Sequence, residues 1–401
     1  PSIDRLATQG CRFSYCFTQH LDPVYARAAL MTGQYPSRLG STAVLSHSPM
    51  LLPRLLRPYG YRCAGMGAMQ LTSVNRDWRR PYPDLGFDQL EVSDAFGRED
   101  AYSAHLQSRH SDAGERVSSA LVQGERGGQF YSLPPDSTPN AFVGSRALGF
   151  LQQQARTGQP FFCKVGFRAF HYPLVMPQRF LALYEPEKLP LPDIFPYLMD
   201  RFGVQEDQLR RWQHGYYATI SEIDHHVGIL LQELERLQLS QNTVVVYTAG
   251  RGRFAGPLLE ESGTWIPDVM ARVPLIVRGP ADMVLSELHC NSMVEAVDIV
   301  PTLLELVDIP RPPEIQGKSF VPVLAGESRQ HRDSSILELP DRRLLRTRYF
   351  QYVIRDDGLE SLFDVSKPET VFTDVSNDLR YRGTVMDHRH QLILRMLKIS
   401  A

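Results

Sequence analysis

The sequence predicts an α/β protein with a large, mostly parallel central sheet flanked by helices, followed by a small antiparallel α+β subdomain at the C-terminus. Three apolar runs support the central sheet: 160–167 (PFFCKVGF), 243–250 (TVVVYTAG) and 273–279 (VPLIVRG). Continuous runs of this kind are typical of parallel strands that are buried on both faces. From about residue 334 polar and apolar residues alternate, and the Asp-Asp-Gly turn at 356–358 indicates a hairpin.

Helical segments separate the predicted strands, as an α/β fold requires. Apolar residues recur every three or four positions over 141–154, 208–239 and 297–307. A short helix at the start of the chain is expected to end at Gly10, because glycine commonly terminates helices.

One polar stretch interrupts this pattern. Residues 95–140 are rich in Gly and Ser, which predicts the longest loop of the chain. We therefore divide the chain into a large α/β domain over 1–333 and a small C-terminal subdomain over 334–401.

Composition narrows the class of protein. The 401 residues carry a net charge of −2, which argues against non-specific binding to nucleic acid or acidic membranes. No run approaches the ~18 apolar residues of a membrane-spanning helix. The opening PSIDRLATQG lacks the basic start and apolar core of a signal peptide, which leaves the compartment open. Five cysteines are too few and too scattered for a disulfide framework.

Several stretches resemble the formylglycine-dependent sulfatases, a family of the alkaline phosphatase-like superfamily. Residues 29–40 (ALMTGQYPSRLG) are similar to the end of the family signature, Cys or Ser-x-Pro-Ser-Arg-x-x-x-Leu or Met-Thr-Gly. Residues 61–73 and 81–88 are similar to the Gly-Lys-Trp-His-Leu-Gly block and the Gly-Phe-Asp that follows it. Residues 167–177 resemble the Pro-His-x-Pro block, and 216–252 resemble the approach to the metal motif. The resemblance spans nearly the whole chain in the family's order.

The resemblance implies a known chemistry. In the family a hydrated formylglycine attacks sulfur beside a divalent cation, usually calcium. The cation's ligands come from an Asp-Asp pair on the first strand and an Asp-Asn or Asp-His pair late in the chain. Lysines and histidines bind the sulfate and protonate the leaving group. Such a site works by stabilising charge in the transition state, and a hard cation needs several oxygen ligands.

This chain departs from the family at the nucleophile. Counting back from Gly33 places the nucleophile position on Pro23, whose side chain has no heteroatom. The Pro and Ser of the signature fall on Tyr25 and Ala26. The signature residues that remain are Arg27, Met31, Thr32 and Gly33.

The other chemical positions are also altered. The family's Lys-Trp-His is replaced by Ala68, Met69 and Gln70. The late metal ligands fall on Gly250 and Arg251, and a guanidinium there would repel a cation. The late lysine falls at about Gly263, and the first metal-binding strand would lie before Pro1 and is expected to be missing. His171 of the histidine block is retained.

The structural segments match while the chemical positions do not, so we expect a catalytically inactive pseudo-sulfatase. It would use no cation or other cofactor, and it would bind a sulfated or other anionic small molecule, a glycan or a partner, but not nucleic acid. One alternative is an active sulfuric or phosphoric ester hydrolase with a non-standard nucleophile. Tyr25 is the nearest hydroxyl, but its high intrinsic pKa makes it a poor nucleophile. A second alternative is a truncated, non-functional family member with a gap in its central sheet.

We predict that Arg27, His171 and Arg251 form an anion-binding site without metal. Arg27 has a plainer interpretation as a structural arginine near Asp22, His171 as a core or loop histidine, and Arg251 as an outward-pointing side chain. His225 and His226 are adjacent on the predicted helix and therefore point in different directions, so they cannot easily coordinate one metal ion. We expect both histidines on a solvated helix face.

Overall fold

The structure is a computed structural model. The residues that it describes are 1–40, 48–71, 84–94, 100–110, 129–130, 134–168, 175–192, 195–252, 265–280, 283, 289–367 and 371–400.

A first, mixed sheet contains four strands. In spatial order they are β7 (Val245–Thr248), β8 (Arg272–Arg278), β1 (Cys11–Phe17) and β9 (His289–Glu295). Strand β1 is parallel to β9 and antiparallel to β8, and β7 is antiparallel to β8. The apolar side chains of these strands form a buried cluster with the helices that follow β9.

A second sheet contains three parallel strands. They are β3 (Gln89–Val92), β2 (Arg62–Gly67) and β5 (Phe161–Gly166), with β2 in the middle. Two short strands, β4 (Gln129–Phe130) and β6 (Val175–Met176), form a separate parallel pair.

Helices surround the two sheets. The α-helices are α1 (Ser2–Gln9), α2 (Pro23–Thr32), α3 (Pro36–Leu39), α4 (Leu52–Leu56), α5 (Ala101–Arg109), α7 (Pro139–Thr157), α8 (Gln178–Leu181), α9 (Phe195–Phe202), α10 (Glu206–Arg236), α11 (Asp268–Ala271), α12 (Ile299–Leu306), α13 (Val321–Leu324) and α14 (Arg382–Ser400). The 3-10 helices are η2 (Arg57–Tyr59), η3 (Pro135–Ser137), η4 (Pro186–Lys188), η5 (Leu239–Asn242), η7 (Ala296–Asp298) and η9 (Leu379–Tyr381). Among these residues no helix is long and apolar enough to span a membrane.

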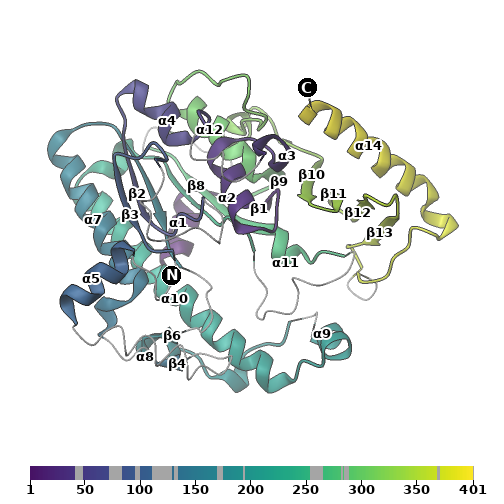
Figure 1. Ribbon diagram of the computed structural model, residues 1–401, viewed down its shortest axis with the longest axis horizontal. Coiled ribbons are helices and arrows are strands. Elements are labelled where there is room, and N and C mark those ends of the chain that lie inside the picture. Colours follow the sequence, from purple (N-terminus) through teal and green to yellow (C-terminus); the bar gives the residue numbers. More distant parts are fainter. Residues whose placement is uncertain are drawn as a thin grey trace.

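The long helix α10 packs against both sheets (Figure 1). Leu230 contacts the cluster around β2, β5 and α7, while Leu231 lies in the cluster with Ile276 of β8. Its Asp224 carboxylate accepts hydrogen bonds from the backbone N–H groups of Ser2 and Ile3 at 3.0 and 2.8 Å. Helix α10 therefore holds the start of the chain as well as the two sheets.

The three predicted strands are present as β5, β7 and β8, and the α/β fold is confirmed. They differ from the expected single, mostly parallel, buried sheet in their direction, sheet membership and burial. Strand β8 is antiparallel to its neighbours, and β5 and β7 belong to different sheets. In the described part of the chain each of these two strands pairs along one side only, and their residues are half-buried.

The predicted C-terminal sheet is also confirmed. Strands β10 (Ser334–Leu339), β11 (Arg342–Thr347), β12 (Phe350–Arg355) and β13 (Glu360–Asp364) form an antiparallel meander. The Asp-Asp-Gly turn joins the last two strands, and Gly358 takes a φ of 83°, which favours glycine. The apolar side chains of Ile336, Leu345 and Tyr352 share one buried cluster with Val24 of α2. The division at residue 334 stays a prediction.

A buried ionic network links Tyr35, at the start of α3, to strand β9 and helix α14. Glu295 of β9 is fully buried and accepts hydrogen bonds from the Tyr35 hydroxyl and from the guanidinium of Arg395 on α14, the latter at 2.7 Å. Arg332 forms a second ion pair with Glu295 at 3.1 Å and a bidentate pair with buried Asp298. These two arginines lower the cost of burying the carboxylates.

Two expectations need correction. The stretch 95–140 contains helix α5, which begins where the Asp100 side chain accepts a hydrogen bond from the Ser103 N–H at 2.8 Å. The rest of that stretch lies largely outside the described residues. The solvated face expected for the histidine pair is wrong for His226, which is only 8% exposed, whereas His225 is exposed. Packing of α10 on α7 covers His226.

Candidate functional site

Helix α2 places the former nucleophile position directly after strand β1. Its N-cap is Asp22, whose carboxylate accepts a hydrogen bond from the Val24 N–H at 2.8 Å. Pro23 is the first helical residue, where a missing backbone N–H costs nothing and the fixed φ suits the helix. The position thus suits the start of a helix, and its side chain offers no atom that could attack an ester.

Arg27 lies one turn along the same helix. Its Nη1 donates a hydrogen bond to the Pro23 carbonyl at 3.2 Å. Its side chain lies so close to Gly250 that a Cβ added there would be 3.0 Å from Arg27 Cγ and 3.7 Å from Nε. The predicted anion-binding residue Arg27 and the segment after β7 that carries Arg251 are therefore brought together. Arg251 is partly buried in the bend that follows Gly250.

Lys164 is a cation that our sequence analysis missed. It lies in the middle of β5, and its Nζ donates a hydrogen bond to the Ala68 carbonyl at 2.7 Å. Burial, and then the positive charge of Arg27, lowers its pKa to about 8, while Asp94 acts in the opposite direction. Lys164 is the only charged residue of β5, and a single charge within an apolar strand is a signal that could have identified it as a site residue.

The loop after β2 is fixed by its backbone. The Asp94 carboxylate accepts hydrogen bonds from the N–H groups of Met69 at 2.8 Å and Gln70 at 3.2 Å. Gln70 also has a φ of 41°, a left-handed conformation that glycine usually adopts. Asp94 therefore sets the conformation of the segment in which the family places its lysine and histidine. Asp94 itself was not predicted.

The remaining predicted positions cannot be compared in the same way. His171 and Gly263 lie outside the described residues. Among the residues that are described, no three His, Cys, Asp or Glu side chains are grouped so as to hold a metal ion. Arg27 and Lys164 are cations and cannot serve as ligands of a hard divalent cation, and the nearby Asp94 carboxylate accepts hydrogen bonds from two backbone N–H groups.

Comparison with known proteins shows which family the chain belongs to. The sulfatase family profile matches residues 1–309. The chain belongs to the sulfatase family. The ulvan-active sulfatase of Formosa agariphila is 26% identical over 389 residues, covering 91% of this chain and 70% of that protein. The iduronate 2-sulfatase of Mus musculus is 24% identical, covering 80% of this chain and 66% of its own length.

The fold of this sulfatase-family chain also matches solved structures. The phosphonate monoester hydrolase SpPMH from Silicibacter pomeroyi superposes with a TM-score of 0.82 at 20% identity, covering 99% of this chain and 90% of that one. At this identity the likeness shows the fold alone.

Tyr25, the nearest hydroxyl to the nucleophile position, is not activated by any described group. Its Oη donates a long hydrogen bond of 3.4 Å to the Gly40 carbonyl. The ring of His20 lies 4.9 Å away between centroids, but the His20 Nδ1 accepts a hydrogen bond from the Asp22 N–H. Burial lowers the pKa of His20 to about 4. A weak base that is already hydrogen-bonded is poorly suited to take a proton from Tyr25.

Proposed function

We propose that this member of the sulfatase family is a pseudo-sulfatase that binds an anionic group without hydrolysing it. The proposal rests on one observation. By the family signature Pro23 falls on the nucleophile position, its carbonyl accepts a hydrogen bond from Arg27, and the charge of Arg27 acts on buried Lys164.

Loss of the nucleophile supports the absence of turnover. A covalent mechanism needs a side-chain heteroatom at this position, and proline has none. The nucleophile and the groups that stabilise its transition state act as a unit, so losing several together removes most of the rate enhancement. Ala68 and Gln70 replace two of those groups in the adjacent loop.

The charges support anion binding. Arg27 remains protonated at any physiological pH, and it depresses the pKa of Lys164, so the two cations repel each other. An anion between them would relieve that repulsion and accept charge-assisted hydrogen bonds. Arg251 adds a third positive charge to the same region.

The proposed ligand is the sulfate group of a glycan or small molecule. Two relatives are named for ulvan and iduronate, which supports a sulfated sugar. The chain covers only part of each relative, so the substrates of those proteins serve here as guides to ligand chemistry.

Titration calorimetry with sodium sulfate tests the proposal. We expect saturable binding by the wild type and at least tenfold weaker binding by Arg27→Ala and by Lys164→Met. Arg156→Ala, which removes an exposed arginine at the end of α7, is the matched control and should bind normally. Wild-type affinity in both site variants would contradict the proposal, as would steady hydrolysis of a sulfate ester.

A further inference from the structure

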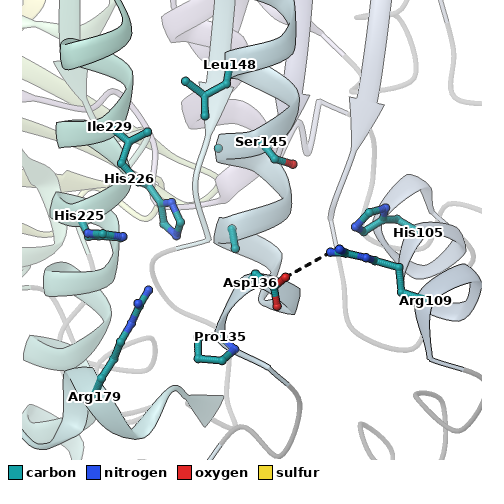
Figure 2. Close-up of a pocket in the computed structure, with 12 residues that line it drawn as sticks. His105, Arg109, Pro135, Asp136, Ser145, Leu148, Arg179, His225, His226 and Ile229 are labelled. Carbon is teal, nitrogen blue, oxygen red and sulfur yellow. Dashed lines mark hydrogen bonds and ion pairs between the residues drawn. The ribbon is translucent and has the colours of Figure 1, made fainter.

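A pocket lies between helices α5, α7 and α10, and its described lining includes neither Arg27 nor Lys164. Its volume is about 760 Å³, and its walls also include η3 and helix α8 (Figure 2). Pockets of several hundred Å³ are of the size that takes up small organic ligands.

One wall of the pocket is basic. Figure 2 shows Arg179, His225 and His226 converging on this side. Arg179 makes no hydrogen bond or ion pair with any described residue, and its guanidinium lies 4.6 Å from the ring centroid of Phe180. It therefore keeps its full capacity to donate hydrogen bonds to a ligand.

His226 is the least satisfied of these groups. It is 8% exposed, and its buried Nε2 has no hydrogen-bond partner. A Cβ added at Gly144 on α7 would lie 3.1 Å from its Nδ1, so the ring is held firmly against that helix. A buried imidazole without a partner is costly, and a ligand in the pocket would supply one.

The acids around the pocket already have partners. Asp136 forms an ion pair with Arg109 at 3.4 Å on the opposite wall. Glu222 accepts hydrogen bonds from Thr138 and Asn140, both at 2.7 Å. The basic wall is thus left without a described counter-ion within ion-pair distance.

We propose that this pocket binds an organic molecule bearing one anionic group, a sulfate, phosphate or carboxylate. The guanidinium of Arg179 and the imidazoles of His225 and His226 donate to the anion. The opposite wall carries the Asp136–Arg109 pair, and Leu148 and Ile229 add apolar lining, so the body of the ligand is expected to present both hydroxyl groups and an apolar face, as a sugar ring does. The low pKa of His226, about 4, keeps its ring neutral near pH 7, so it acts as a neutral donor. This site is separate from the one at Arg27 and does not depend on the proposed function.

NMR of the histidine ring signals tests the proposal. The probes are D-glucuronate, D-glucose 6-sulfate and D-glucose 6-phosphate, with D-glucose as the neutral control. The His226 signals are assigned by comparison with His226→Gln. We expect them to shift saturably with at least one acidic sugar and not with glucose. Comparing the three charged sugars shows whether the pocket takes a carboxylate, a sulfate or a phosphate.

Variants distinguish binding in this pocket from binding at the site around Arg27. Arg179→Ala should weaken the His226 response at least tenfold, and because Arg179 is exposed its removal should leave the fold intact. Arg27→Ala and Arg156→Ala should leave the response unchanged. The inference is overturned if no probe shifts the His226 signals, or if the shift keeps its wild-type affinity in Arg179→Ala.

Discussion

Arg27 and Gly250 touch across the candidate site. Because Gly250 has no side chain, the Arg27 side chain fits against its backbone. A Cβ added at Gly250 would lie 3.0 Å from Arg27 Cγ, closer than ordinary van der Waals contact. The contact joins the middle of helix α2 to the segment after β7. It is the local feature that brings two family motifs, far apart in sequence, to one place.

Gly250→Ala is therefore expected to displace Arg27 by a few tenths of an ångström and to weaken sulfate binding several-fold. Calorimetry measures the affinity, and circular dichroism verifies the fold. Gly149→Ala on α7 is the matched control, because an added Cβ there meets nothing within 4 Å. That control should bind sulfate normally and unfold at an unchanged or slightly higher temperature. Equal affinity in both variants would show that the position of Arg27 does not matter for binding.

Lys164 should make stability depend on pH in the alkaline range. Its pKa is about 8 in the folded protein and about 10.4 in an unfolded chain. Between these values the unfolded state binds more protons, so this group's contribution to stability rises with pH. Below pH ~8 the cost of the buried charge is fully present.

Urea unfolding at pH 7.5 and pH 10.5 measures this effect when wild type and Lys164→Met are compared. We expect the increase in unfolding free energy over this interval to be larger for the wild type, because only it contains the lysine. Identical changes in the two proteins would mean that the Lys164 pKa is close to its ordinary value.

Purified protein should not hydrolyse 4-nitrophenyl sulfate. The physical reason is the absence of a nucleophile at Pro23, and release of 4-nitrophenolate measures the reaction. Turnover that disappears in Tyr25→Phe would instead identify a substitute nucleophile and support an active hydrolase.

Calcium should leave the protein unaffected. Arg27 lies near Lys164, and Arg251 follows Gly250, which Arg27 contacts. These three side chains are cationic, whereas a hard cation needs carboxylate ligands. Thermal unfolding with millimolar calcium and with a chelator should give the same midpoint. A midpoint that rises with calcium concentration would show that a metal site is present after all.

Arg395→Ala should destabilise the protein by about 2 kcal/mol or more. The substitution removes one partner of buried Glu295, and breaking a buried pair typically costs ~3–5 kcal/mol, which Arg332 reduces by remaining in place. Arg380→Ala, in an exposed pair with Asp378, is the control and should cost much less, because solvent screens exposed ion pairs. Chemical unfolding compares the two variants, and equal losses would contradict a structural role for the network.

The fold was largely predictable because its signals are local. The apolar runs of β5, β7 and β8 and the turn at Gly358 each lie within a few residues of sequence. Helix α5 was missed because its stretch is polar overall, and its apolar contacts come from only two buried side chains, Tyr102 and Leu106.

The candidate sites were harder to predict because they depend on contacts between distant segments. The sequence identified Arg27 through the family signature, but not its contact with Gly250. Lys164 was hidden within a strand that reads as apolar. The surroundings of His226 depend on Gly144 of another helix, and no local pattern reveals that pairing.

The half-buried strands β5 and β7 have a consequence for the behaviour of concentrated protein. Along the side of each strand that has no described partner, backbone N–H and C=O groups can pair with an extended segment of another molecule. Such pairing is a route to aggregation, and a lysine on an edge strand opposes it because stacked copies would bring like charges together. Lys164 stands in the middle of β5. Pairing at this edge would bring the Lys164 ammonium groups of two molecules together, so we expect Lys164→Met to aggregate at concentrations that the wild type tolerates.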